Sequence, residues 1–392
     1  MNVKIEENLV ISPEGRITAE NAKQLESEIQ EIINKHPGLT PTFDLERVEY
    51  ISSAGLRMFL VFSKQFKEKL TIRNVLPEIY EVFSVTGFTS IMNVEKKLRQ
   101  ISVEGCKVLG KGAGGTVYRL DGETIVKVYS GPNPKQEIEE GQAKAKYALI
   151  RGVPTAIAFD RVRVGENDGA VYELLEAKTF QEIVSAQPER LEEMTERYLK
   201  FLRQLHDLTA EKFGDLEDAR KMHLDWLEKL RGLMPDEVMD GVCSLIKTMP
   251  EDLHIVHGDL HMKNLMFCNG EPMVIDMDTL STGNKVFEIG RLVTFYKIIP
   301  EHHDAFEQEF FHFPKGTCAY ILGKILEQYP DPKDQAKLML VGYINMVEII
   351  DFRFRRDGEK ASVEHRDEDL KECSASMAEL LTKVDSLVLN QA

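Results

Sequence analysis

The chain contains no long run of apolar residues and few cysteines. Its longest apolar stretches, such as 58–62, are far shorter than the roughly 20 residues that a membrane-spanning helix needs. The first residues lack a basic segment followed by an apolar core, so the sequence predicts neither a membrane span nor a signal peptide. The five cysteines are scattered and include no Cys-x-x-Cys pair. They indicate reduced thiols in a cytoplasmic protein and no zinc site.

Positive charge is also scarce. Lys and Arg number 49 against 65 Asp and Glu, which gives a net charge of −16. The sequence therefore argues against a nucleic-acid-binding protein, because such proteins need a basic surface to neutralise phosphates. An acidic chain attracts cationic small molecules, so the charge favours a cationic substrate, although acidity that serves only solubility is an equal alternative. The length of 392 residues predicts two or three domains.

What the chain does contain, in its second part, is a set of residues suited to phosphoryl transfer. That reaction needs a backbone cradle and a cation for the phosphates, metal ligands, and a carboxylate beside the attacking hydroxyl. The cradle is a G-x-G-x-x-G-x-V segment formed by Gly110, Gly112, Gly115 and Val117. Its glycines let backbone N–H groups approach phosphate oxygens closely. Lys127 follows on a β-branched run that is typical of a strand.

The remaining groups follow further along the chain. Asp259 and Asn264 lie five residues apart, and Asp276 closes a short apolar run. Each group has a plain structural explanation when it is taken alone. The glycines could form a tight turn, Lys127 could be an exposed lysine on a strand, and Asp259 could be a turn residue or a helix cap. Their joint order makes a phosphotransferase the better interpretation.

Residues 106–392 resemble the kinase-like superfamily in its small-molecule branch, which holds aminoglycoside phosphotransferases, choline kinases, homoserine kinases and fructosamine kinases. The resemblance implies a two-lobed α+β fold with a β-rich lobe over 106–176 and a helical lobe over 177–392. It also implies ATP and Mg²⁺ as cofactors. Where protein kinases have His-Arg-Asp and Asp-Phe-Gly, this chain has His-Gly-Asp at 257–259 and Asp-Met-Asp at 276–278. Both departures favour a small molecule with a hydroxyl group as the acceptor.

The resemblance assigns a role to each matched residue. Asp259 would be the catalytic carboxylate that orients the acceptor hydroxyl and takes its proton. Asn264 and Asp276 would hold Mg²⁺, since hard oxygen ligands suit that ion. Lys127 would neutralise the α- and β-phosphates. Asp278 is either a further metal ligand or a solvated acid.

A glutamate on the helix predicted over 134–152 would hold Lys127 in place. Proline early in this segment and glycine at its end support the helix. We favour Glu140, because positions 143/144 and 147/148 on its face include two alanines. The alternatives in the same turns are Glu137 and Glu139.

Residues 1–100 form a separate unit in which short strands alternate with amphipathic helices, so we expect an α/β domain with one sheet. The polar segment 93–105 is the expected linker. The expected strands are 4–11, 42–45 and 70–75, and the expected helices lie near 19–35 and 53–68 with a third after Pro77.

The segment 43–62 within this unit, FDLERVEYISSAGLRMFLVF, joins an apolar strand to a helix. Hydroxyl side chains at such a junction are usual helix caps. The segment, together with 70–92, resembles the STAS family of sulfate transporters and anti-sigma-factor antagonists. In antagonists of that family a serine is phosphorylated, and the matching residue is Ser53. The family commonly has Asp before that serine, whereas this chain has Ser52.

The leading hypothesis is an ATP-dependent phosphotransferase acting on a small-molecule hydroxyl, controlled or localised by a STAS module that binds a protein partner. The first alternative is a signalling scaffold whose kinase fold binds nucleotide with little catalysis. The second is a kinase whose acceptor is a protein hydroxyl, with Ser53 of the same chain as a candidate.

Overall fold

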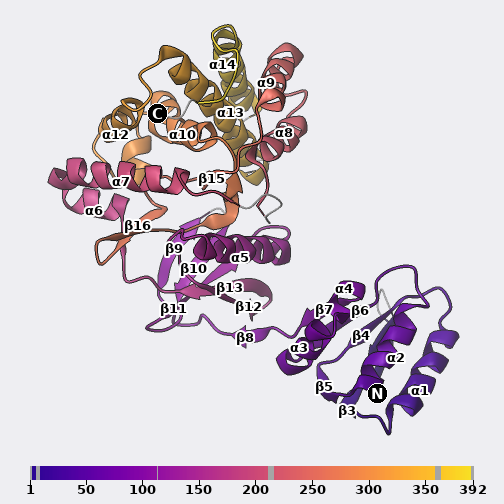
Figure 1. Ribbon diagram of the computed structural model, residues 1–392. Helices are drawn as coiled ribbons and strands as arrows, with labels where there is room; N and C mark the ends of the chain where they lie inside the picture. Colours follow the sequence, from indigo (N-terminus) through magenta and orange to yellow (C-terminus); the bar gives the residue numbers. More distant parts are fainter. Residues whose placement is uncertain (1, 6–8, 113, 211–215, 358–362, 390–392) are drawn as a thin grey trace. The chain divides into compact units, whose positions relative to one another are not determined.

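The structure is a computed structural model that describes residues 2–5, 9–112, 114–210, 216–357 and 363–389 (Figure 1). The chain divides into two compact units, residues 1–102 with 161–166, and residues 103–160 with 167–392. Among the described residues, no helix has the length and apolar character needed to cross a membrane.

The first unit is an α/β domain, as the sequence predicts. Its main sheet has the order β1-β2-β4-β6-β7, with β1 antiparallel and the other neighbours parallel. A second pair, β3 and β5, is also parallel. The strands are β1 (Asn2–Ile5), β2 (Leu9–Ser12), β3 (Glu14–Ile17), β4 (Pro41–Asp44), β5 (Arg47–Ile51), β6 (Thr71–Val75) and β7 (Asn93–Lys96). The helices are α1 (Ala22–Lys35), α2 (Ser53–Ser63), α3 (Pro77–Val85) and α4 (Phe88–Ile91).

Aromatic rings fill the core between the sheet and α2. Phe43 of β4 contacts Phe59 and Phe62 of α2, with ring centroids 5.1 and 5.7 Å apart, and all three are fully buried. Gly55 permits this close approach, because a Cβ at that position would lie 2.7 Å from Ile17 and 2.8 Å from Ile51. The helix therefore needs glycine where it crosses β3 and β5.

The segment expected to be a linker is largely strand. Residues 93–96 form β7 beside β6, and residues 99–101 form β8 (Arg99–Ile101), which pairs in parallel with β12. An edge strand buries only part of its side chains, so a polar sequence can form one. The sequence pattern missed both strands for that reason.

The β-rich lobe of the second part of the chain has one sheet of order β8-β12-β13-β11-β10-β9 and one long helix, α5. These elements are β9 (Val108–Gly112), β10 (Gly115–Arg119), β11 (Thr124–Tyr129), α5 (Pro134–Ile150), β12 (Ala158–Val164) and β13 (Asn167–Glu173). Glycine follows α5 at position 152 with φ +84°, as the predicted helix end requires.

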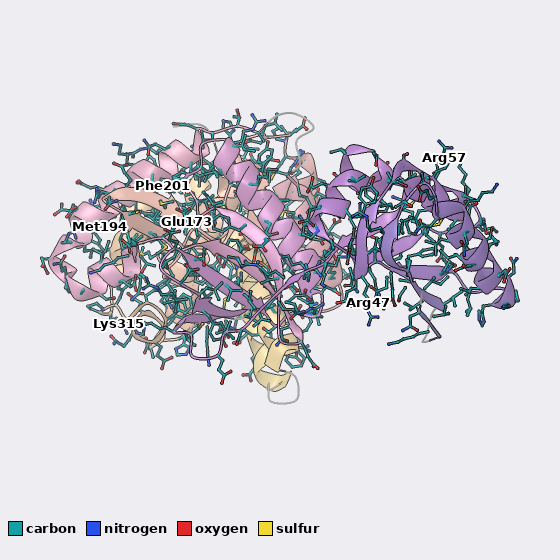
Figure 2. All side chains as sticks on the ribbon, turned by 90° about the horizontal axis from the view of Figure 1, so that it is seen from below. Arg47, Arg57, Glu173, Met194, Phe201 and Lys315 are labelled. Atoms are coloured by element: carbon teal, nitrogen blue, oxygen red, sulfur yellow. The ribbon has the colours of Figure 1, made fainter. Side chains whose placement is uncertain are left out.

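The remaining chain is a helical lobe with short strands at its edge (Figure 1), so the predicted two-lobed α+β fold is confirmed. Met194 and Phe201 of α7 are buried in the core of this lobe (Figure 2). In the first unit, Arg57 of α2 is exposed. The helices are α6 (Phe180–Ala186), α7 (Leu191–His206), α8 (Ala219–Lys229), α9 (Asp236–Thr248), α10 (Val286–Val293), α11 (Ile299–His302), α12 (Thr317–Leu326), α13 (Pro332–Asp357) and α14 (Val363–Leu381). The strands are β14 (Lys178–Thr179), β15 (Ile255–Val256), β16 (Leu265–Cys268), β17 (Glu271–Val274) and β18 (Ser281–Thr282), and the single helical turns are η1 (Pro188–Arg190), η2 (Met277–Thr279), η3 (Thr294–Ile298) and η4 (Glu307–Phe311).

Candidate active site

The glycine-rich segment is the turn of an antiparallel hairpin. Strands β9 and β10 pair Gly112 with Gly115, so residues 113 and 114 connect them, and residue 113 lies outside the described residues. Gly115 has φ +147°, and a Cβ there would collide with the carbonyl oxygen of Val128. At Gly110 and Gly112 a Cβ would meet no atom within 4 Å. The hairpin therefore needs glycine at 115 for its own packing and leaves open space at 110 and 112.

Lys127 lies next to this hairpin. Strand β11 pairs with β10 so that Lys127 stands opposite Val117. A Cβ on Gly114 would lie 3.8 Å from Cε of Lys127, which places the turn against the lysine side chain. The Nζ atom of Lys127 lies 3.2 Å from Asp276 Oδ1 and 3.3 Å from Asp278 Oδ2. The strand lysine and the Asp-Met-Asp segment thus meet at one point.

Lys127, Asp276 and Asp278 shift one another's pKa values through their charges. Burial opposes the charged form of Lys127, but Asp276 and Asp278 outweigh it and raise the lysine's pKa above its ordinary value. Burial by itself would raise the pKa of Asp276, yet the Lys127 ammonium holds that pKa below its usual range. Burial and the charge of Asp276 raise the pKa of Asp278.

The structure does not bring Glu140 to Lys127. Glu140 is exposed and accepts a hydrogen bond from Gln136 Nε2 at 2.7 Å. Helix α5 instead turns Gly141 toward Asp278, since a Cβ at 141 would lie 2.6 Å from Asp278 Oδ1. One turn further, Lys144 Nζ donates to the carbonyl oxygen of Asp278 at 2.6 Å. The prediction of Glu140 as the partner of Lys127 is therefore wrong, and α5 contacts Asp278 through Gly141 and Lys144.

A second hairpin brings the two expected metal ligands to the same end. Strands β16 and β17 pair Leu265 with Val274, so Asn264 and Asp276 lie just beyond the paired ends. The Nδ2 atom of Asn264 donates to the carbonyl oxygen of Asp259 at 2.9 Å and lies 3.4 Å from its Oδ2. Because the amide nitrogen bonds Asp259, the Oδ1 atom of Asn264 is the acceptor that remains for a cation.

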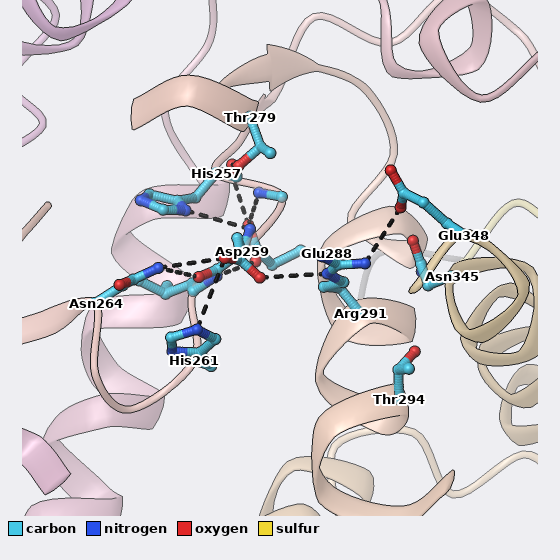
Figure 3. A network of polar contacts seen from close by, with 12 residues as sticks. His257, Asp259, His261, Asn264, Thr279, Glu288, Arg291, Thr294, Asn345 and Glu348 are labelled. Atoms are coloured by element: carbon cyan, nitrogen blue, oxygen red, sulfur yellow. Dashed lines mark hydrogen bonds and ion pairs between the residues drawn. The ribbon is translucent and has the colours of Figure 1, made fainter. Parts of the chain in front are cut away.

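Asp259 lies in the loop 257–264, which we name the catalytic loop (Figure 3). Its Oδ1 atom lies 3.2 Å from Arg291 Nε of α10, and Arg291 Nη1 lies 3.2 Å from Glu348 of α13. Its Oδ2 atom lies 3.7 Å from Nε2 of His261. Burial lowers the pKa of His261, so the imidazole is neutral at neutral pH. Its Nδ1 accepts the backbone N–H of Lys263, which leaves the proton on the nitrogen that faces Asp259.

Glu288 fixes the backbone of the catalytic loop. This carboxylate is fully buried and accepts the backbone N–H groups of His257 at 2.7 Å, Gly258 at 3.0 Å and Leu260 at 3.2 Å. The hydroxyl of Thr279 also supports the loop, because its Oγ1 atom donates a hydrogen bond to the backbone carbonyl oxygen of His257 at 2.7 Å. Glu288 and Arg291 lie three residues apart on α10. Glu288 holds the backbone on either side of Asp259, and Arg291 holds its side chain. Neither residue was assigned a role from the sequence.

The donor set fits a magnesium ion. The side chains of Asp276, Asp278 and Asn264 offer carboxylate and amide oxygens, which Mg²⁺ prefers. With Lys127, the two aspartates carry one uncompensated negative charge. Among the described residues, no cluster of three or more His, Cys, Asp and Glu side chains could hold a metal ion. An ion here would therefore need further oxygens from a bound ligand.

Ser53 belongs to the first unit. Its neighbour Ser52 is the N-cap of α2, and Ser52 Oγ accepts the N–H of Gly55 at 3.3 Å. Ser53 is the first residue of the helix and is exposed. Arg57, one turn later on the same helix, is exposed as well.

Two family models match the chain. The model described as the phosphotransferase enzyme family matches residues 105–315, just over half of the chain. The chain belongs to this phosphotransferase family. The STAS domain model matches residues 1–101. BtrV of Bordetella bronchiseptica, which bears the name of an anti-sigma factor antagonist, is 37% identical over 94 residues, or 23% of this chain and 80% of BtrV. A STAS domain thus precedes a phosphotransferase domain, and both predicted resemblances are confirmed.

Solved structures that are similar to this chain include an aminoglycoside phosphotransferase and a choline/ethanolamine kinase family protein. The gentamicin complex of aminoglycoside phosphotransferase APH(2")-IIa is 13% identical, with a TM-score of 0.46, over 79% of this chain and 98% of that chain. A choline/ethanolamine kinase family protein from Mesorhizobium loti is 14% identical, with a TM-score of 0.46, over 71% of this chain and 91% of that chain. At these values the likeness says nothing about the acceptor of this phosphotransferase.

Proposed function

We propose that the phosphotransferase domain transfers the terminal phosphoryl group of ATP to a hydroxyl group of a small molecule. The main support is that two hairpins, distant in sequence, bring Lys127 to Asp276, while Asn264 at the end of the second hairpin contacts Asp259. This is the combination of cation, metal ligands and carboxylate that phosphoryl transfer needs. The five free cysteines fit a reducing cytoplasm, where ATP is available.

Each residue then has a definite task. The glycines of the β9–β10 hairpin let backbone N–H groups reach phosphate oxygens, and Lys127 balances their charge. Asn264 and Asp276 hold Mg²⁺, which neutralises the phosphates when bound. Asp259, held at Oδ1 by Arg291, orients the acceptor hydroxyl and takes its proton as the new phosphate ester forms. Glu288 keeps the loop in the geometry that this proton transfer requires.

A small molecule is the preferred acceptor because the chain has Gly258 between His257 and Asp259, and Met277 after Asp276. Both positions differ from the pattern of protein kinases. The second candidate function is a nucleotide-binding scaffold with little catalysis. The contact of Asp259 Oδ1 with Arg291 favours it, since one oxygen of the proposed base is already engaged.

Replacing Asp276 by Ala should abolish most of the thermal stabilisation that Mg·ATP gives the wild type. The aspartate holds the ion, and without the ion the phosphate charges near Asp278 and Asp259 lose their compensation. Differential scanning fluorimetry with and without Mg·ATP measures the shift. Asp304, an exposed partner of Lys315, provides the control, because Asp304→Ala removes the same charge from the surface.

An Asp276→Ala variant that Mg·ATP stabilises as much as the wild type would show that Asp276 does not hold the ion. If Asp304→Ala lost as much of the Mg·ATP stabilisation, the effect would come from the change in the protein's net charge and not from the loss of a metal ligand.

We further propose that the STAS domain binds a protein partner and that a phosphate on Ser53 controls this binding. Because Ser52 is the cap, the hydroxyl of Ser53 is not needed by the helix. A phosphate there would meet the favourable end of the helix dipole and the nearby Arg57.

Ser52→Ala should therefore destabilise the start of α2 by about 1 kcal/mol, as loss of a cap does, whereas Ser53→Ala should leave it unchanged. Hydrogen exchange of residues 53–63 in the full chain measures this, with roughly fivefold faster exchange expected only for Ser52→Ala. Faster exchange in Ser53→Ala would assign Ser53 to the helix cap and remove the reason to regard its hydroxyl as available.

A further inference from the structure

Lys263 is a charged residue of the catalytic loop to which the proposed mechanism gives no task. It lies between Asp259 and Asn264, directly before the expected metal ligand. We infer that Lys263 forms an anion-binding subsite beside Asp259, and that the acceptor carries a carboxylate or phosphate group as well as its hydroxyl. This inference rests on the proposed transfer to a small-molecule hydroxyl and specifies its substrate class.

The surroundings of the ammonium group are the first support. The Nζ atom of Lys263 lies 4.0 Å from the ring centroid of Phe310, and the side chain is partly buried. Within the described parts of the chain, it makes no ion pair with a carboxylate. Arg291 nearby pairs with both Asp259 and Glu348. The face of an aromatic ring stabilises a cation but accepts few hydrogen bonds from it. The N–H groups of the Lys263 ammonium therefore remain free to donate to an oxygen of a ligand.

The platform under Lys263 is rigid. The ring of Phe310 stacks on Phe306 and Phe295, with centroids 5.0 and 6.0 Å apart and planes inclined by 10° and 21°. The turn η4 that carries Phe310 is held by Glu307, whose buried carboxylate accepts the backbone N–H groups of Gly316 and Cys318. A rigid platform fixes the place of the cation before a ligand arrives.

His261 connects this platform to the reaction centre. Its ring meets Phe310 and Phe295 edge to face, with centroids 5.7 and 4.9 Å apart. Its Nε2 atom lies 3.7 Å from Asp259 Oδ2. Contacts therefore link Lys263 to Asp259 through the rings of Phe310 and His261. An acceptor that extends along these two rings could place its hydroxyl at Asp259 and an anionic group at Lys263.

The cation belongs on the acceptor side. Phe310 and Phe306 come from the helical lobe, whereas the expected phosphate contacts, Lys127 and the β9–β10 hairpin, come from the β-rich lobe. The net charge of −16 favours a cationic acceptor at long range. Salt screens the influence of the net charge beyond about 8 Å at physiological ionic strength. The charge of the acceptor group that binds next to Lys263 is therefore set by Lys263 itself.

The test compares acceptor pairs that differ by one anionic group: glycerol with glycerate, and glucose with glucose 6-phosphate. Isothermal titration onto the full chain gives each dissociation constant. At least one anionic compound should bind at least tenfold more tightly than its neutral partner. Lys263→Gln should reduce that preference below threefold, and Lys263→Arg should keep it. Lys247→Gln, an exposed lysine of α9, removes the same charge and should bind as the wild type does.

The inference is overturned if no anionic compound is preferred, or if the preference survives in Lys263→Gln. It is also overturned if Lys263→Gln weakens Mg·ATP instead, which would assign the cation to the nucleotide. Asp259→Asn separates this inference from the proposed function, because it should lose turnover and keep the anion preference. Anion-selective binding without any phosphoryl transfer in the wild type would overturn the function alone.

Discussion

Asp259→Asn should reduce turnover at least a hundredfold while leaving Mg·ATP affinity and thermal stability near wild-type values. A general base contributes roughly 10² to 10⁴ in rate, and the amide cannot take the proton of the acceptor hydroxyl. The amide keeps the size of the side chain. Its one oxygen can still accept a hydrogen bond from Arg291, and Asn264 keeps its bond to the backbone carbonyl of residue 259. Steady-state rates and nucleotide titrations on the same preparation separate the two effects.

The matched control for this variant is Asp304→Asn, which changes an exposed carboxylate to an amide. Wild-type turnover in Asp259→Asn would rule out Asp259 as the base. A loss of ATP binding equal to the loss of turnover would instead assign Asp259 to the nucleotide site.

Glu288→Ala should destabilise the phosphotransferase domain by about 3 kcal/mol or more and abolish turnover. The substitution leaves three buried backbone N–H groups without their acceptor, and each such group costs about 1–3 kcal/mol. Glu288→Gln should show a smaller loss, because Oε1 serves Leu260 and Oε2 serves His257 and Gly258, and an amide replaces only one of these oxygens. Chemical unfolding and the rate of transfer measure both effects.

Glu301→Gln is the control for Glu288, since Glu301 forms an exposed pair with Lys297 that contributes little to stability. Wild-type unfolding in Glu288→Ala would contradict the role of this carboxylate as the support of the loop. A stable Glu288→Gln variant with full turnover would show that one acceptor oxygen is enough.

Local sequence spacing predicted much of the site. Turn and strand chemistry is short-ranged, so the G-x-G-x-x-G-x-V segment could be recognised as a turn and Lys127 as a strand residue. Asn264 and Asp276 flank a short apolar stretch that folds back on itself, which explains why the structure brings them together. The alternation of strands and helices likewise predicted the α/β domain before residue 100.

The partners supplied by the helical lobe could not be predicted. Glu288 and Arg291 act on a loop some 30 residues earlier, and only the folded helix α10 brings them there. The partner of Lys127 is a similar case. Helical periodicity placed Glu140 on a favourable face, but the contact depends on which turn of α5 meets residues 277–279. That turn presents Gly141, and Lys127 pairs with the two aspartates.

Transfer of labelled phosphate from ATP to a panel of small molecules with hydroxyl groups, including amines, sugars and alcohols, tests the central claim most directly. Wild type and Asp259→Asn are compared side by side. We predict a labelled phosphate ester from the wild type on at least one acceptor and at least a hundredfold less from the variant. ATP binding without label transfer to any acceptor, or equal transfer by the two proteins, would contradict the claim that Asp259 serves a small-molecule phosphotransferase.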